Sequence, residues 1–215
     1  RFNAGALDFL DRHPPPGRGF ASLSDSSYLI FSGRPVFADG RLELHDLSTF
    51  ETFLAVASGS IDPDAGPGLE EVRWALVDHH ALQPLVSRLE SEGSGWRPVY
   101  VDGTHVLYVA DQGETRSYLD GLARRFPSLP VLDLNSARAE SESTFWRAAA
   151  PVRSLRLGAY AFRAGWPGRA VEFLERADRI EPLDPVHRLF LAQSYLDPTL
   201  PGGTDLIRAE AAFRR

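Results

Sequence analysis

The hydrophobic positions of this chain form short runs in its first half and helical spacing in its second half. Two apolar runs, residues 28–31 (YLIF) and 35–38 (PVFA), are separated by residues 32–34 (SGR). Each run is too short for a helix and is rich in aromatic and branched side chains, so the pattern predicts two buried strands. The polar turn at 39–41 (DGR) follows the second run. Because α/β folds usually bind ligands at the carboxyl ends of strands, this turn is the first place to look for a site.

The rest of the first half alternates apolar runs with amphipathic segments. The pattern predicts helices at 4–12, 49–57 and 82–92, strands at 18–23 and 74–77, and a polar turn at 24–27. Residues 96–101 and 106–110 alternate apolar and polar side chains around Asp102-Gly103, which is a strong signal for a β-hairpin. This order predicts an α/β domain over residues 1–112, built as a mixed-sheet α/β sandwich.

Strand patterns stop after that domain. Residues 113–150 form a predicted helical connector, with helices at 117–126 and 137–150 and an extended segment at 127–135. Residues 151–215 contain only helix and turn patterns. The predicted fold is therefore an α/β domain followed by an all-α helical repeat.

Small and apolar residues of the last segment fall at the offsets of one tetratricopeptide (TPR) unit. They are Leu157, Gly158, Ala161, Gly165, Ala170, Leu174, Ala177 and Pro182. The small side chains let two antiparallel helices approach closely, and the proline ends the second helix. A second unit begins at Asp184-Pro185 and carries an insertion of about five residues at 197–203. Since about three repeats are needed for stability, we expect further repeats downstream, or a cap formed by residues 137–150.

The composition narrows the class of protein. The net charge is −6, so the chain lacks the basic footprint of a nucleic-acid or anionic-membrane binder. There is no Cys, which excludes disulfides and thiolate metal sites. There is no Met, which predicts a processed chain or a piece of a longer protein. No apolar run approaches the roughly 20 residues that span a bilayer, and no signal peptide is visible, so any membrane anchor is expected outside this segment.

Four motifs stand out in the first half: residues 28–30 (YLI), 36–41 (VFADGR), 53–54 (FL) and 96–102 (WRPVYVD). Taken together, they resemble a soluble extracytoplasmic domain of bacterial multi-spanning membrane proteins, those similar to mannosyltransferase-like (GT-C) glycosyltransferases. The resemblance covers about residues 1–112, and TPR repeats often follow that domain. The chain departs from the family at 24–27, where the family has Trp-Gly-Gly.

The resemblance implies a non-catalytic accessory region, because in such transferases the catalytic carboxylates lie in loops between membrane helices. It implies a location on the extracytoplasmic (periplasmic) face of a bacterial membrane, tethered by upstream transmembrane helices.

The best candidate ligand site is Asp39-Gly40-Arg41, where a carboxylate and a guanidinium are positioned to hold a polar ligand. The alternative is an Asp39–Arg41 pair or Asx-type turn that fixes the backbone, with Gly40 permitting positive φ. The alternative is favoured, because short-range pairs of this kind are common in turns.

A His and carboxylate metal site is a weaker hypothesis. Asp78, His79 and His80, together with Asp39 and His45, offer ligands that suit zinc or a similar ion. However, adjacent strand residues point to opposite faces, and no recognised ligand spacing is present. Ordinary loop histidines are the favoured interpretation.

Other chemistry is poorly represented. The sequence has no nucleophile elbow, no phosphate-binding loop and no evident base beside the serines of 24–27. Trp96 is positioned at a strand entrance where it could stack on a sugar, although core packing is the more common role.

These patterns predict a binding and assembly module that uses no cofactor and docks a protein partner through the TPR-like helices. One alternative is an enzyme with Asp39, Arg41, His45 and His79 around a polar pocket. Another is a soluble TPR scaffold without a membrane tether.

Overall fold

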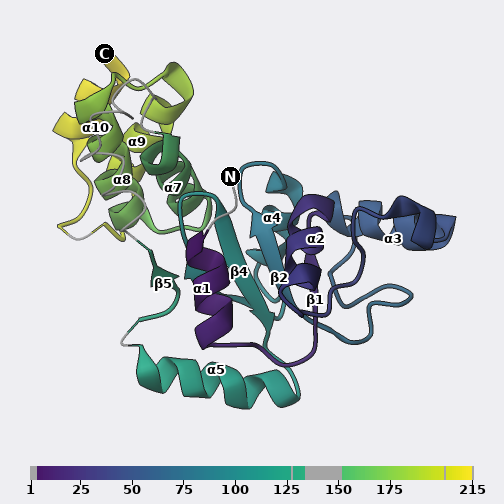
Figure 1. The fold of residues 1–215 in the computed structure, drawn as a ribbon. Coiled ribbons are helices and arrows are strands. Elements are labelled where there is room, and N and C mark those ends of the chain that lie inside the picture. The colour runs from purple at the N-terminus through teal and green to yellow at the C-terminus, as the bar shows by residue number, and fades with distance from the viewer. Residues whose placement is uncertain (1–3, 127, 134–151, 201, 215) are drawn as a thin grey trace. The chain divides into compact units, whose positions relative to one another are not determined.

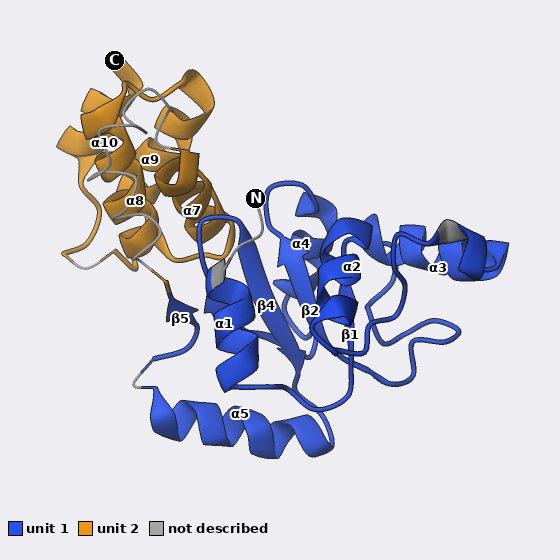
Figure 2. Cartoon of the chain, in the orientation of Figure 1, with its two compact units in different colours: residues 1–132 blue, residues 133–215 orange. Residues whose placement is uncertain are grey.

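The computed structural model describes residues 4–126, 128–133, 152–200 and 202–214, which form a mixed α/β structure (Figure 1). The chain divides into two compact units, residues 1–132 and 133–215 (Figure 2). The division comes later than the boundary expected at residue 112, because α5 (Glu114–Arg125) and β5 (Val131–Leu132) belong to the first unit. The helix predicted at 137–150 lies outside the described residues.

The first unit is built on a five-stranded sheet with the order β1-β2-β4-β3-β5. The other strands are β1 (Arg18–Ala21), β2 (Val72–Asp78), β3 (Trp96–Val101) and β4 (His105–Ala110). Strand β1 is parallel to β2 and β5 is parallel to β3, whereas β4 is antiparallel to both β2 and β3. The predicted mixed sheet and the predicted hairpin around Asp102-Gly103 are confirmed.

Helices cover both faces of this sheet. They are α1 (Ala4–Arg12), α2 (Leu23–Phe31), α3 (Leu47–Ala57) and α4 (Gln83–Leu89), with a short 3₁₀ turn, η1 (Leu42–Leu44). Trp74 and Leu76 pack into one core with α1, α2 and α5. Phe20, which pairs in register with Ala75, stacks on Phe53 of α3 at 5.2 Å between ring centroids. Burial on both faces explains why the sequence of β2 reads as a continuous apolar run.

The prediction of a strand at residues 28–31 is wrong, because these residues form the last part of helix α2. The polar stretch predicted as a turn is the start of the same helix. Ser22 is the N-cap, and its Oγ accepts a hydrogen bond of 3.2 Å from the Asp25 amide. Only Leu29 of the apolar run is fully buried, and Phe31 is 89% exposed. The apolar run therefore does not mark a buried strand, and the cap decides the local structure.

The strand predicted at residues 35–38 is reduced to a single bridge. Val36 pairs in parallel with Gly19, through the Gly19 amide to the Pro35 carbonyl (2.9 Å) and the Phe37 amide to the Gly19 carbonyl (2.8 Å). Val36, Phe37 and Ala38 are buried as expected. Since proline has no amide proton to donate, Pro35 limits the length of this ladder.

The second unit contains four described helices joined by turns, as the spacing predicts. They are α7 (Val152–Arg163), α8 (Pro167–Ile180), α9 (Pro185–Leu196) and α10 (Leu206–Arg214). Helices α8, α9 and α10 share one core, which includes Leu174, Leu191 and Ala209. The N-cap Asp184 accepts hydrogen bonds from the Val186 and His187 amides and so fixes the start of α9.

Helices α7 and α8 approach each other closely at Gly158. A Cβ atom placed there would lie 2.6 Å from the Cγ atom of Leu174. Ala170 and Ala177 on α8 are fully buried. Small residues at these positions therefore permit the tight antiparallel hairpin that the sequence predicts.

Candidate functional site

The predicted ligand site at Asp39 forms a turn that is closed on itself. The Asp39 carboxylate is only 3% exposed. The Arg41 amide donates to Oδ1 at 2.9 Å, and Arg41 Nε donates to Oδ2 at 2.9 Å. The hydrogen bonds from the Arg41 side chain lower the pKa of Asp39 to about 2, against the opposing effect of burial. The carboxylate is thus ionised, and both of its oxygens already accept hydrogen bonds from Arg41.

His45 completes the same turn. Its Nε2 atom lies 3.3 Å from the Asp39 amide nitrogen, which donates to it, and 3.4 Å from Asp39 Oδ1. The structure therefore brings together Asp39, Arg41 and His45, as the site hypothesis requires. However, the oxygens of the carboxylate face Arg41 and His45, so the arrangement matches the alternative, a turn that fixes the backbone.

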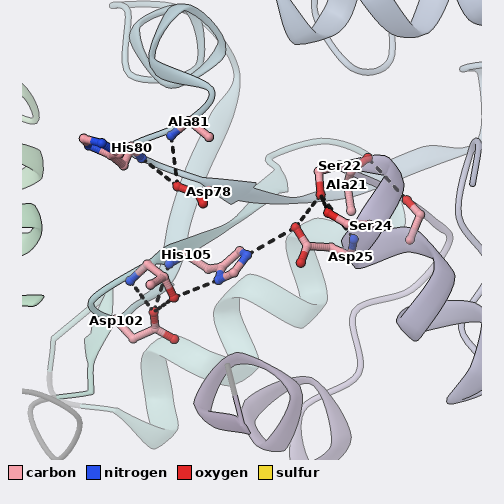
Figure 3. A network of polar contacts seen from close by, with 11 residues as sticks. Ala21, Ser22, Ser24, Asp25, Asp78, His80, Ala81, Asp102 and His105 are labelled. Atoms are coloured by element: carbon pink, nitrogen blue, oxygen red, sulfur yellow. Dashed lines mark hydrogen bonds and ion pairs between the residues drawn. The ribbon is translucent and has the colours of Figure 1, made fainter. Parts of the chain in front are cut away.

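A second group of polar residues lies where β1 and β2 end and β4 begins (Figure 3). Ser22 and Asp25 come from the start of α2, Asp78 ends β2, and Asp102 and His105 flank the hairpin turn. Because β1 and β2 are parallel, their carboxyl ends meet at this edge, which is where ligand sites form in open α/β sheets. These five residues form the edge group, and four of them, Asp25, Asp78, Asp102 and His105, have titratable side chains.

An ion pair between His105 and Asp25 is the centre of the edge group. His105 Nε2 lies 3.2 Å from Asp25 Oδ2, and Ser22 Oγ donates to the same oxygen at 2.6 Å. Burial lowers the pKa of His105, but the hydrogen bond and charge of Asp25, together with the charges of Asp102 and Asp78, outweigh it, so this pKa lies above its ordinary value. Burial raises the pKa of Asp25, and the contacts with His105 and Ser22 reverse that shift to a net lowering. Both charged forms are therefore favoured.

Asp102 organises the other side of the edge group. The amides of Thr104 and His105 donate to its Oδ1 at 2.8 and 2.9 Å, and the Tyr100 hydroxyl donates to Oδ2 at 3.1 Å. Thr104 Oγ1 also donates to Asp102 Oδ1 at 3.2 Å. These contacts form an Asx-type turn that sets the direction in which β4 begins.

The order Thr104, His105, Asp25 has the geometry of a hydroxyl, an imidazole and a carboxylate in series. Thr104 Oγ1 lies 3.0 Å from His105 Nδ1. Because the hydroxyl donates to Asp102, its lone pairs are free to accept from Nδ1, and the cationic imidazole that the raised pKa of His105 favours donates from both ring nitrogens. A cationic imidazole cannot take the hydroxyl proton, so the series is a structural link between α2 and β4 rather than an activated nucleophile.

The space beside this link is small. A cavity of about 10 Å³ is lined by Asp25, Tyr28, Leu29 and His105, among others. Such a volume holds about one water molecule. The edge group therefore offers a tight connection between elements and leaves no room there for a substrate.

The predicted metal ligands do not converge. His79 is 1% exposed, and its Nε2 contacts the Asp102 carbonyl oxygen at 3.0 Å. Burial lowers the pKa of His79 to about 4, so it is neutral. His80 is exposed, and its amide donates to Asp78 Oδ1 at 2.9 Å. Among the described residues, no group of three or more His, Asp or Glu side chains is arranged to hold a metal ion.

Trp96 is the first residue of β3 and is only 6% exposed. A sugar needs an open aromatic face to stack on. The ring of Trp96 lies in the core and provides no such platform in this structure.

The sequence analysis missed Asp25 and His105, which lie 80 positions apart and meet only in the folded sheet. One local signal was present, since Ser22 and Asp25 have the spacing of a helix N-cap and its third residue. Interpreting that spacing as a helix start would have placed Asp25 at the carboxyl end of β1. Nothing local in the sequence identifies His105 as its partner.

The second unit has a larger concave feature, a groove bounded by α8, α9 and α10. Its volume is about 320 Å³. It is lined by Glu175, Asp178, Arg179, Leu183, Arg188, Leu191, Tyr195, Arg208, Ala211 and Ala212. The groove therefore combines charged side chains with an apolar floor.

Comparisons with known proteins identify no relative: no family model, curated protein or solved structure matches the chain. Within the described ranges, no helix is long and apolar enough to cross a membrane. The class that the fold defines is therefore a mixed α/β unit joined in sequence to a helical unit, and function has to be argued from the sites.

Proposed function

We propose that this chain is a binding and assembly module whose helical unit docks a protein partner. The observation that carries the proposal is the contrast between two concave features. The groove of the helical unit measures about 320 Å³, whereas the cavity beside the edge group measures about 10 Å³. Ligand sites usually have volumes from about 300 Å³ upward, so the groove has the size for recognition and the cavity does not. The first unit also has an open hollow of about 520 Å³, but Arg18, Glu71, Arg73 and Glu114 make its lining mostly charged, without the apolar floor of the groove.

The same proposal includes a TPR-like arrangement of the helices. The close approach at Gly158, the buried Ala170 and Ala177, and the cap at Asp184 support it. Stacked helical hairpins present extended surfaces for protein ligands. A partner protein is therefore the class of ligand that this unit suits best.

We further propose that the module is the non-catalytic extracytoplasmic region of a membrane-anchored glycosyltransferase-like protein. The support is the resemblance in sequence. The segment 96–102 forms the expected strand and turn, whereas residues 28–30 are helical where the family pattern expects a strand. The tether would come from a segment outside the described residues.

An enzyme that uses Asp39, Arg41, His45 and His79 is not favoured. The ionised carboxylate of Asp39 is already in contact with Arg41 and His45. His79 is buried and neutral, and it contacts the Asp102 carbonyl oxygen. These residues form two separate structural groups rather than one polar pocket.

The test is photo-crosslinking in the native cells with the full chain. A photoreactive side chain replaces Ala211, which is exposed and lines the groove, or Glu92, which is exposed in the first unit. We expect a discrete crosslinked protein from position 211 and none from position 92. Equal crosslinking from both positions, or none from 211, would overturn docking through the helical unit.

A further inference from the structure

The groove of the helical unit contains five charged side chains around an apolar floor. Leu183, Leu191 and Ala212 of the floor are buried in the unit's core. The charged residues are Glu175, Asp178, Arg179, Arg188 and Arg208. Which of these charges remains available to a ligand depends on which already has a partner within the chain.

Both acidic side chains of the groove are already engaged. Glu175 accepts a hydrogen bond from the Tyr195 hydroxyl and pairs with Arg208 Nη1 at 3.5 Å. Asp178 Oδ1 accepts from the Leu183 amide at 3.2 Å and so fixes the turn after α8. Arg208 also pairs with Asp205 at 3.4 Å and lies over the Tyr195 ring. These three charges are therefore largely satisfied from within the unit.

Arg179 and Arg188 differ from the other charged residues of the groove. Neither side chain forms an ion pair or hydrogen bond with a described residue. Arg188 is half-buried, and its Nε atom is shielded from solvent without an acceptor. A buried donor without an acceptor is uncommon in a folded protein and calls for an explanation.

The unsatisfied charge of the groove is therefore positive, in a chain whose net charge is −6. A guanidinium binds a carboxylate through two parallel hydrogen bonds from its N–H groups. The apolar floor of the groove suits an aliphatic or aromatic side chain next to that carboxylate.

We propose that this groove binds an acidic peptide segment of the partner protein. A carboxylate of the segment accepts hydrogen bonds from the side chains of Arg188 and Arg179. A neighbouring apolar side chain of the segment packs on Leu191 and Ala212. This inference rests on the proposed function and adds the chemistry of the partner. Nucleic acid fits the groove less well, because two available arginines beside an apolar floor do not form the extended basic surface that follows a phosphate backbone.

The experiment uses the immobilised full chain and a synthetic library of random octapeptides, with sequencing of the bound fraction. We expect the wild-type chain to enrich peptides that carry Asp or Glu beside an apolar residue. The selected peptide is then titrated against variants. Arg188→Gln and Arg179→Gln should each weaken its binding about tenfold, because each removes a charge-assisted hydrogen bond.

Arg169→Gln is the matched control. Arg169 is exposed at the start of α8, pairs with Glu172 and does not line this groove. The substitution removes the same charge from the same unit, so binding should be unchanged. If Arg188→Gln destabilises the helices, the exposed Arg179 still carries the test, because Arg179→Glu should reverse the preference toward basic peptides.

The outcomes separate the two proposals. Peptides that bind in the groove without acidic enrichment, or whose affinity is unchanged by both arginine variants, would overturn the acidic-segment proposal and leave docking through the helical unit standing. If, in addition, position 211 gives no crosslinked protein, both the docking proposal and the acidic-segment proposal are overturned.

Discussion

At the scale of single residues, the chain places its titratable side chains in pairs that hold elements together. The Asp25–His105 pair joins α2 to β4, and the Asp39–Arg41 pair closes a turn. The side chains of Asp25 and His105 are 18% and 9% exposed, so water screens their attraction only in part. The stability that such a pair contributes depends on pH, because both side chains titrate.

We predict that Asp25→Asn lowers the pKa of His105. Burial lowers this pKa, and the hydrogen bond and charge of Asp25 are the largest effects that raise it, ahead of the charges of Asp102 and Asp78. The measurement is an NMR titration of the His105 ring in both proteins. The exposed carboxylate Asp120 of α5 provides the control, since Asp120→Asn should leave the titration unchanged.

The same substitution should change stability with a defined pH dependence. The raised pKa of His105 gives a contribution that is present below 6.5 and is lost as pH rises through the folded-state pKa. The lowered pKa of Asp25 gives a contribution that is present above 3.8 and is lost on acidification. Asp25→Asn should therefore cost about 1–3 kcal/mol of unfolding free energy between these limits and less at alkaline pH. A cost that does not vary with pH would mean that the pair is not ionised.

At the scale of elements, helix packing depends on where side chains are small. We predict that Gly158→Ala lowers the unfolding free energy by about 1–3 kcal/mol, because its Cβ would lie 2.6 Å from Leu174 Cγ and force α7 away from α8. Gly121→Ala in α5 is the matched control, since nothing lies within 4 Å of its Cβ position.

Urea denaturation followed by circular dichroism measures both variants. The control should gain up to about 1 kcal/mol, because alanine replaces glycine in an open helix position. A stabilised Gly158→Ala variant would show that α7 and α8 are not held at this close distance.

Elements were predictable where the local pattern and the tertiary contacts agree. The Asp102-Gly103 turn specifies a hairpin, and the apolar run of β2 is buried on both faces, so both were predicted correctly. Residues 28–31 were predicted wrongly, because aromatic and branched side chains favour strands while Ser22 caps a helix. The candidate site was harder, since Asp25 and His105 meet only through the pairing of β1, β2 and β4.

At the scale of the whole molecule, each unit has a separate role in the proposal. In the first unit, the buried side chains of Asp102, His105 and Asp39 have partners within the unit. The described part of the second unit leaves Arg179 and Arg188 without partners. Recognition is therefore expected to reside in the helices.

The location of the protein tests the proposed membrane setting. We predict that the full-length protein sediments with membranes and that protease added to intact spheroplasts digests this region, because the resemblance places it on the extracytoplasmic face. The measurement is immunoblotting of fractionated cells with an antibody to residues 152–200. A cytoplasmic protein that survives in intact spheroplasts and is digested only after lysis serves as the control. If this region is likewise protected until lysis, the extracytoplasmic setting is excluded, and the groove between α8 and α10 would then serve an untethered scaffold.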